Sequence, residues 1–374
     1  MADLSIYVHI PYCIKRCGYC DFNTYTPSEL QDGATLEIVS ADYIDAVVQE
    51  LQSAPKDKVS TIFFGGGTPS LLPAKDLGRV ISAIREHNGL FHDAEITLEA
   101  NPDSVTPEKL AEYISVGFNR ISFGAQSFVP HVLSTLDRTH NPDNVKKAVD
   151  AARAAGFSSI SVDLIYGTPG ESLEDWRKTV TEALSLDIDH ISAYALIVET
   201  GTKLAAQIKR GDLTMPNDDL MADMYLLVDQ MCNEAGLNWY ELSNWAKPNK
   251  ECLHNIAYWK SANWWGLGPG AHSHVDRKRF WNVKHPTAYK QKLFSGESPI
   301  ADSEDLTPEQ LHDESIMLAI RMRSGLALSL LSETAKDNLA AYKSSGHLEI
   351  IDGAIQLTAQ GRLIADRLVR EALA

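Results

Sequence analysis

Near its beginning the chain reads HIPYCIKRCGYCDF over residues 9–22, which places Cys13, Cys17 and Cys20 in a C-x3-C-x2-C spacing. Thiolates are good ligands for iron, and an iron–sulfur cube is normally held by four of them. The other two cysteines, Cys232 and Cys252, lie far downstream. The cluster of three therefore predicts a cube whose fourth iron stays open to a small chelating ligand.

An open iron is what a radical protein needs if it binds S-adenosylmethionine (SAM) through its amino and carboxylate groups. The alternatives are a structural zinc site and a chance cluster of cysteines. Zinc sites usually pair one C-x2-C with a second C-x2-C or with a histidine pair, and no such element follows this stretch. The spacing favours the iron–sulfur interpretation.

The composition limits the class of protein. The chain has 374 residues, enough for two or three domains, and a formal net charge of −16, which argues against a nucleic-acid surface. No apolar run reaches membrane-spanning length, and the first residues lack the pattern of a signal peptide. Five cysteines, three of them clustered, are typical of metal binding in a reducing compartment. We expect a cytoplasmic protein.

Strand and helix patterns alternate after the first residues. The predicted strands are Leu4–Ile10, Val59–Phe64, Glu95–Leu98, Arg120–Phe123, Ser159–Ile165 and His190–Leu196. The predicted helices are Ala41–Leu51, Leu77–Ile84, Pro107–Val116, Asn144–Ala154 and Leu173–Leu186. Six such units predict an α/β fold with a parallel sheet, a partial (β/α)6 TIM-like barrel with its chemistry at the carboxyl ends of the strands.

Polar motifs follow these strands. The second strand leads into Gly65-Gly66-Gly67-Thr68, where exposed backbone amides could hold an anion such as a carboxylate. Other candidates at the same edge of the sheet are Glu99, Gln126, Arg138, Asp163 and Ala195. Each one alone is more often a helix cap or a surface group, but their joint position predicts a cofactor site.

Taken together, YVHIPYC-x3-C-x2-C-x-F, FFGGGTPS, LEANPD, ISFGAQSF, LDRTH and DLIYGTP resemble the oxygen-independent coproporphyrinogen III oxidase branch of the radical SAM superfamily. The resemblance runs from Tyr7 to about His274. It implies a [4Fe–4S] cluster on the three cysteines of the first stretch. It also implies SAM contacts from Tyr7, Tyr19, Gly67, Thr68, Glu99, Gln126, Arg138, Asp163 and Ala195.

Two departures separate the chain from the oxidase itself. The oxidase has a further cysteine where Phe22 stands, and a long segment before its first strand, whereas here only six residues precede Tyr7. Both features are similar to the oxidase-like haem chaperones of the HemW group. That resemblance implies haem as a further ligand, acceptor haemoproteins such as respiratory enzymes as partners, and a homodimer. The alternative is radical decarboxylation of coproporphyrinogen III to protoporphyrinogen IX.

The second mark of that group is HNIAYW over residues 254–259, an HNxxYW motif. In a helix His254 and Tyr258 share one face, and histidine can ligate haem iron. A buried histidine that is satisfied by its neighbours is the alternative. The resemblance makes His254 a candidate haem contact and Cys252 a weaker one.

Three domains are predicted: a barrel over residues 1–240, a barrel-closing segment over 241–300, and a C-terminal domain over 301–374. We interpret residues 264–273, WWGLGPGAHS, as a glycine-rich loop beside the barrel mouth. The last domain has helices at Glu309–Arg321 and Ala335–Lys343, strands at His347–Ile351 and Ala354–Leu357, and a final helix Ala359–Ala372. This order is typical of a small winged-helix-like α+β module.

Overall fold

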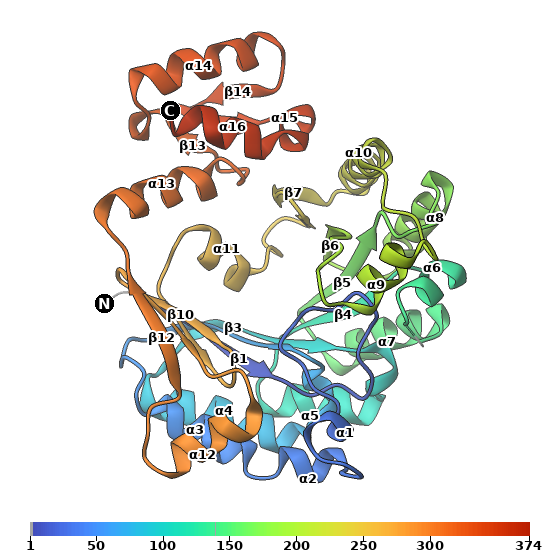
Figure 1. Cartoon of the computed structure of the whole chain (residues 1–374), viewed down its shortest axis with the longest axis vertical. Coiled ribbons are helices and arrows are strands. Elements are labelled where there is room, and N and C mark those ends of the chain that lie inside the picture. Colours follow the sequence, from blue (N-terminus) through green and yellow to red (C-terminus); the bar gives the residue numbers. More distant parts are fainter. Residues whose placement is uncertain (1–2, 139) are drawn as a thin grey trace.

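A computed structural model describes residues 3–138 and 140–374 of the chain (Figure 1). Its main feature is a twelve-stranded sheet in the order β12-β11-β10-β9-β1-β2-β3-β4-β5-β6-β8-β7. The strands from β1 to β6 follow chain order and pair in parallel. The predicted parallel α/β core is therefore confirmed, and it lies in the centre of a larger sheet.

The parallel strands are β1 Leu4–Ile10, β2 Val59–Gly66, β3 Leu90–Ala100, β4 Arg120–Gln126, β5 Ser159–Tyr166 and β6 His190–Ala195. The other strands of the main sheet are β7 Asn238–Glu241, β8 Asn244–Ala246, β9 Trp264–Leu267, β10 His272–Val275, β11 Lys278–Asn282 and β12 Ile300–Asp305. The longer helices before β7 are α3 Tyr43–Leu51, α4 Ala74–His87, α5 Pro107–Val116, α7 Pro142–Ala155, α8 Leu173–Leu184 and α10 Asp218–Glu234.

Short helices complete this part: α1 Pro27–Leu30, α2 Leu36–Ser40, α6 Pro130–Thr135, α9 Lys203–Arg210, α11 Leu253–Trp259 and α12 Pro286–Phe294. The caps explain several boundaries that the sequence predicts. Helix α5 begins with the Thr106 side chain accepting a hydrogen bond from the Lys109 N–H, and it ends at Gly117, whose φ of 116° suits glycine alone.

Successive residues of the parallel strands point to opposite sides of the sheet. One side, here called the helix face, carries apolar residues that are buried under α3, α4, α5, α7 and α8, among them Ile62, Leu98 and Phe123. The other side, the cavity face, carries mainly polar residues such as Thr97, Ser122 and Asp163. These five helices thus cover one face of the sheet, whereas α11 lies on the cavity side (Figure 1).

Strands beyond the parallel core extend the sheet at both edges. Strand β9 pairs in parallel with β1, and β8 pairs antiparallel with β6. The interpretation of residues 264–273 as a loop is wrong, because Trp264–Leu267 and His272–Val275 form strands and only the residues between them turn. Residues 241–300 thereby supply strands to the main sheet. Each of these strands has only four residues, so its alternating pattern could not be recognised beside the glycines.

The C-terminal unit follows β12, which still pairs with β11. It has its own sheet in the order β13-β15-β14 and its own apolar core. Its elements are α13 Pro308–Ala319, β13 Leu326–Ala327, α14 Glu333–Ser344, β14 Leu348–Ile351, β15 Ala354–Leu357, α15 Ala359–Leu363 and α16 Ala365–Ala372. The predicted single final helix is wrong, since it breaks at Ile364.

A buried ion pair joins this unit to the main sheet. Arg362 in α15 donates two hydrogen bonds to Asp229 in α10, at 2.8 and 2.6 Å. The Trp245 indole N–H donates to the same carboxylate, and the guanidinium lies 4.4 Å from the centre of the Trp239 ring. The cost of burying the two charges is offset because they pair with each other, because Asp229 accepts a further hydrogen bond, and because the guanidinium stacks on an aromatic ring.

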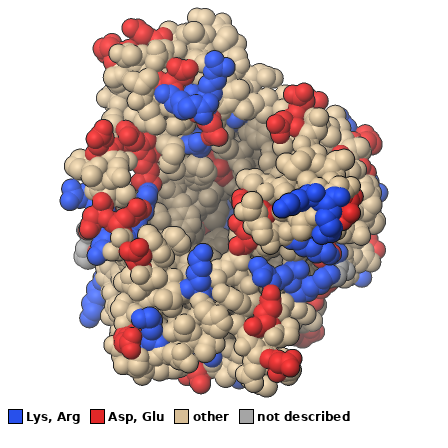
Figure 2. All heavy atoms as spheres, viewed as in Figure 1, with Lys and Arg blue, Asp and Glu red and all other residues tan. Residues whose placement is uncertain are grey.

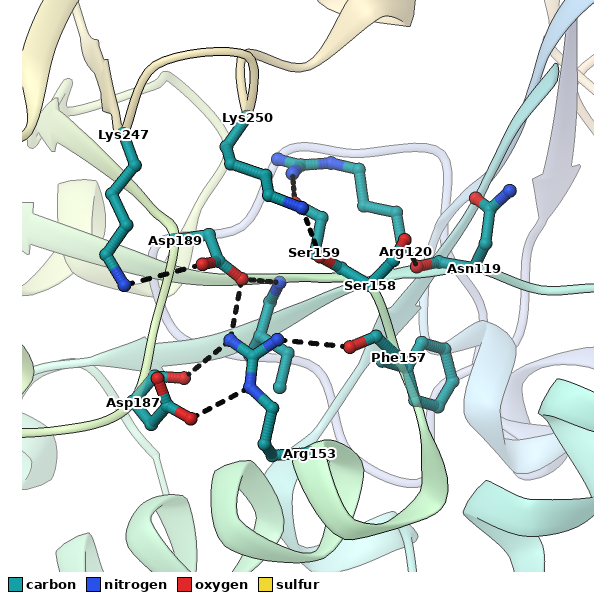
Figure 3. A network of polar contacts seen from close by, with 11 residues as sticks. Asn119, Arg120, Arg153, Phe157, Ser158, Ser159, Asp187, Asp189, Lys247 and Lys250 are labelled. Carbon is teal, nitrogen blue, oxygen red and sulfur yellow. Dashed lines mark hydrogen bonds and ion pairs between the residues drawn. The ribbon is translucent and has the colours of Figure 1, made fainter. Parts of the chain in front are cut away.

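A second polar network ties the amino-terminal ends of β5 and β6 to the helices below (Figure 3). Arg153 of α7 donates to Asp187 and Asp189, and Lys247 lies 3.4 Å from Asp189. This network fixes the end of the sheet opposite to the cysteines. Within the described ranges, no helix has the length and apolar character needed to span a bilayer.

Candidate cofactor and ligand site

The cavity face of the sheet borders a hollow of about 970 Å³. It is lined at one end by the cysteine loop and the carboxyl ends of β2 to β6, and on another side by α11. Figure 2, viewed as Figure 1, shows a deep hollow near the centre of the molecule. The cavity-lining residues include all ten predicted cofactor-binding residues and all three clustered cysteines.

The cysteine loop is held by its neighbours in the sheet. Its beginning is fixed by the Cys13 N–H, which donates to the Tyr25 carbonyl at 3.0 Å. The Thr68 hydroxyl lies 3.8 Å from the Cys13 sulfur, and an Arg138 N–H donates to the Cys17 sulfur at 3.5 Å. Motifs far apart in the sequence therefore meet at two of the three thiols.

The chemistry of these thiols fits a metal cluster. Burial raises the pKa of the Cys13 thiol to about 11 and also raises the pKa of Cys20. The thiolate form therefore needs positive charge beside it, which iron would supply. No three acidic, histidine or cysteine side chains of the described residues converge around a single ion. A cube does not need such convergence, because each thiolate binds a different iron.

The glycine loop after β2 has a different role from the one that the sequence predicts. Its backbone amides are not exposed: Gly66 donates to the Glu99 carboxylate, Gly67 to the Ile10 carbonyl and Thr68 to the Tyr12 carbonyl. A Cβ on Gly67 would lie 2.5 Å from the Tyr12 oxygen. The prediction of an amide cradle for an anion is thus wrong here, and glycine is required because two backbone segments pack closely.

Two acidic residues face the cavity beyond this loop. The buried setting, and then the charge of Asp163, raise the pKa of Glu99 to about 8. Asp163 accepts hydrogen bonds from the Ser122 hydroxyl at 2.9 and 3.0 Å, and burial raises its pKa. Both side chains can accept hydrogen bonds from hydroxyl or amine groups of a ligand.

The remaining predicted SAM contacts surround these acids. Gln126 ends β4 with a φ of 65°, a conformation that few non-glycine residues adopt, and Arg138 donates to the Gly124 carbonyl beside it. The Tyr7 hydroxyl is hydrogen-bonded to His9, and Ala195 is exposed at the end of β6. The pKa of the Tyr19 hydroxyl is raised, first by burial and then by Cys17. Their contact with SAM stays a prediction.

His254 lies in α11, as the motif predicts, with both ring nitrogens hydrogen-bonded. One nitrogen is 2.7 Å from the Thr61 hydroxyl and the other 2.9 Å from the Tyr258 hydroxyl. Burial lowers the pKa of His254 to about 3, so the ring is neutral at physiological pH. Haem contact by His254 stays a prediction, and axial ligation would require the loss of one of these hydrogen bonds.

The sequence interpretation missed residues deeper on the cavity face. Glu95 in β3 accepts hydrogen bonds from the N–H groups of Leu253 and His254, and it thereby fixes the start of α11. Arg120 and His190 also line the cavity, at the first positions of β4 and β6. The period of two along the strand was the signal that could have found Glu95 and Arg120, since they have the same parity as Glu99 and Gln126. No such signal marks His190, because the predicted site residue of its strand, Ala195, has the opposite parity.

Comparison with known proteins agrees with this arrangement. Residues 7–183 match the model of the radical SAM superfamily, and residues 306–364 match that of the HemN C-terminal domain. The structure of coproporphyrinogen III oxidase (HemN) from Escherichia coli superposes with a TM-score of 0.84 at 24% identity, over 99% of this chain and 90% of that one. The fold and the three-cysteine loop thus define a radical SAM protein with a HemN-like architecture.

The sequence relatives narrow this class. The chain is 44% identical to "Heme chaperone HemW" of Mycobacterium tuberculosis, over 99% of this chain and 94% of the relative. It is 32% identical to "Heme chaperone HemW" of Escherichia coli, over 100% of this chain and 99% of the relative. The chain belongs to the HemW family. Membership of the radical SAM superfamily brings a [4Fe–4S] cluster and SAM as cofactors.

Proposed function

We propose that this protein is a haem chaperone, which binds haem in the cavity described above and delivers it to acceptor haemoproteins such as respiratory enzymes. The observation that carries the proposal is the size and lining of the cavity, about 970 Å³ bordered by three thiols on one side and the HNxxYW helix on the other. The identity over nearly the whole length to proteins named heme chaperones supports it.

The mouth of the cavity suits an apolar macrocycle. Ile14, Phe22 and Ile197 line it with side chains that are 66%, 62% and 67% exposed. Large exposed apolar side chains around a concave site are typical of a surface that binds an apolar partner. Phe22 is also the residue that replaces the further cysteine of the oxidase.

We assign the cluster to Cys13, Cys17 and Cys20, and the SAM contacts to the predicted residues around Glu99, Gln126 and Asp163. When bound, the cluster and SAM supply a site for one-electron chemistry. The chain's own part is to hold the thiols: Thr68 and Arg138 place hydrogen-bond donors against two of them. A cytoplasmic setting, in which thiols stay reduced, and a homodimer belong to the same proposal.

The test is anaerobic reconstitution of the cluster followed by haem titration, with the Soret absorbance and the iron content as readouts. We expect stoichiometric haem binding, transfer of haem to an apo-haemoprotein, and no protoporphyrinogen from coproporphyrinogen III with SAM and a reductant. Decarboxylation of coproporphyrinogen III, or no haem binding, would overturn the proposal.

A variant pair tests the ligand assignment. Replacement of Cys17 by alanine should remove nearly all cluster iron, because a cube with two protein thiolates is poorly held. The matched control is Cys232→Ala, in which a thiol buried in α10 away from the cavity is removed. Full iron content in the Cys17 variant would contradict the assignment.

A further inference from the structure

Arg120 is a buried cation on the cavity face whose hydrogen-bonding groups are mostly unused. It is the first residue of β4, and it is 3% exposed. Its side chain shares the cavity face with Ser122, and it lines the same cavity as the three cysteines. The residue therefore forms part of the cavity floor, at the opposite end of β4 from Gln126.

The partners of Arg120 are few. One guanidinium N–H donates to the Ser159 hydroxyl at 2.8 Å, a contact visible in Figure 3. Its Nε has no hydrogen-bond partner among the described residues. No carboxylate of the described residues lies within 4.0 Å of its nitrogens. A guanidinium carries five N–H donors, and a buried one is normally paired with an anion.

The nearby acids are already engaged elsewhere. Glu95 accepts from two backbone N–H groups at the start of α11, and Asp163 accepts from Ser122. The other deep cation of the cavity, Arg138, donates to the Cys17 sulfur and the Gly124 carbonyl. Arg120 is thus a buried positive charge of this floor. Glu95 and Asp163 act on it electrostatically, but no described carboxylate forms an ion pair with it.

We propose that the Arg120 guanidinium receives a carboxylate of the molecule that fills the cavity. This inference rests on the proposed function, under which the carboxylate is a propionate of haem. Guanidinium and carboxylate match in shape and can form two parallel hydrogen bonds. The same chemistry would serve the carboxylate of SAM, so the test separates the two sources.

The experiment compares haem with haem dimethyl ester, in which both propionates are esterified, on the cluster-reconstituted protein. We expect the wild type to bind haem about 10-fold or more tightly than the ester, as one charge-assisted hydrogen-bonded pair allows. Arg120→Met should lose this preference by weakening haem binding and leaving ester binding nearly unchanged. Arg120→Lys, which keeps the charge without the planar fork, should retain part of it.

The matched control is Arg153→Met, which removes an arginine held by Asp187 and Asp189 outside the cavity and should keep the full preference. A preference for haem that survives in Arg120→Met and Arg120→Lys, both shown folded by circular dichroism, would overturn the inference while the haem-chaperone function stands.

Equilibrium dialysis of SAM without haem distinguishes the other source. If Arg120→Met weakens SAM binding and the porphyrin preference is absent from the wild type, the carboxylate site holds and belongs to SAM. If no porphyrin binds the wild type and SAM binding is unchanged in Arg120→Met, both the proposed function and this inference fail.

Discussion

The two faces of the six parallel strands are built from adjacent residues and obey different rules. On the helix face, Ile62, Leu98 and Phe123 are fully buried among other apolar side chains. On the cavity face, Thr97, Arg120 and His190 are almost as buried, yet they are polar. Burial alone thus does not distinguish core from site. What distinguishes them is the chemistry of the buried side chains: those of the core are apolar, whereas those of the site are polar.

Among substitutions on the two faces, we expect the largest loss of stability on the helix face. Replacement of Leu98 by alanine should lower the free energy of unfolding by about 2–5 kcal/mol, because a closely packed side chain is removed and a cavity remains. Denaturant unfolding of the apo-protein measures it. A loss below about 1 kcal/mol would show that the helices repack freely, and the contrast between the faces would weaken.

The second effect is a pH dependence from the cavity face. The pKa of Glu99 is raised to about 8 in the folded protein, against an ordinary value of 4.5. The folded state therefore holds a proton that the unfolded state releases, and stability contributed by Glu99 falls as pH rises from about 4.5 to 8. The loss of stability is on the order of 1–3 kcal/mol, because water in the cavity beside the side chain reduces the effect of burial.

Replacement of Glu99 by glutamine should flatten this fall, because the amide keeps an acceptor for the Gly66 N–H without a titrating group. Unfolding measured at pH 5 and pH 8 checks the prediction. Glu108→Gln, at an exposed position in the first turn of α5, is the control and should leave the slope unchanged. An unaltered slope in the Glu99 variant would refute the assignment of this pH dependence.

The last comparison lies within the cavity face and includes the smallest expected effect. The Thr97 hydroxyl has no partner among the described residues, whereas the Thr61 hydroxyl contacts Ser5 and His254. Thr61→Val should cost about 1–3 kcal/mol by leaving His254 unsatisfied, and Thr97→Val should cost almost nothing. Thermal unfolding of both variants decides it, and equal losses would mean that Thr97 has a buried partner of its own.

Much of this fold could be predicted from the sequence where the local signal was strong. The strand Leu4–Ile10 and the helix Pro107–Val116 have the predicted bounds, because a β-branched run ends at proline and a capped helix ends at glycine. The strands of residues 264–275 were missed, since glycines obscure a pattern of only four residues. The pairing of Trp264–Leu267 with β1 depends on tertiary contacts that no local signal encodes.

The sequence predicted the site residues near the carboxyl ends of the strands but missed those near the beginnings of the strands. Residues near the strand ends, such as Glu99 and Asp163, were found because turn motifs follow them. Arg120 was not found, because it stands at the beginning of its strand, where a charged residue is ordinarily exposed. The glycine loop shows the opposite error: its composition suggested ligand contact, but Gly67 is needed for packing against Tyr12.

The Arg362–Asp229 pair has a consequence for how the two units of the chain can be separated. Removal of the residues after β12 would leave Asp229 as a buried charge without its partner and would uncover the rings of Trp239 and Tyr225. The two units are separate in topology, but we expect them to unfold cooperatively. Heat or denaturant should therefore unfold both in one transition.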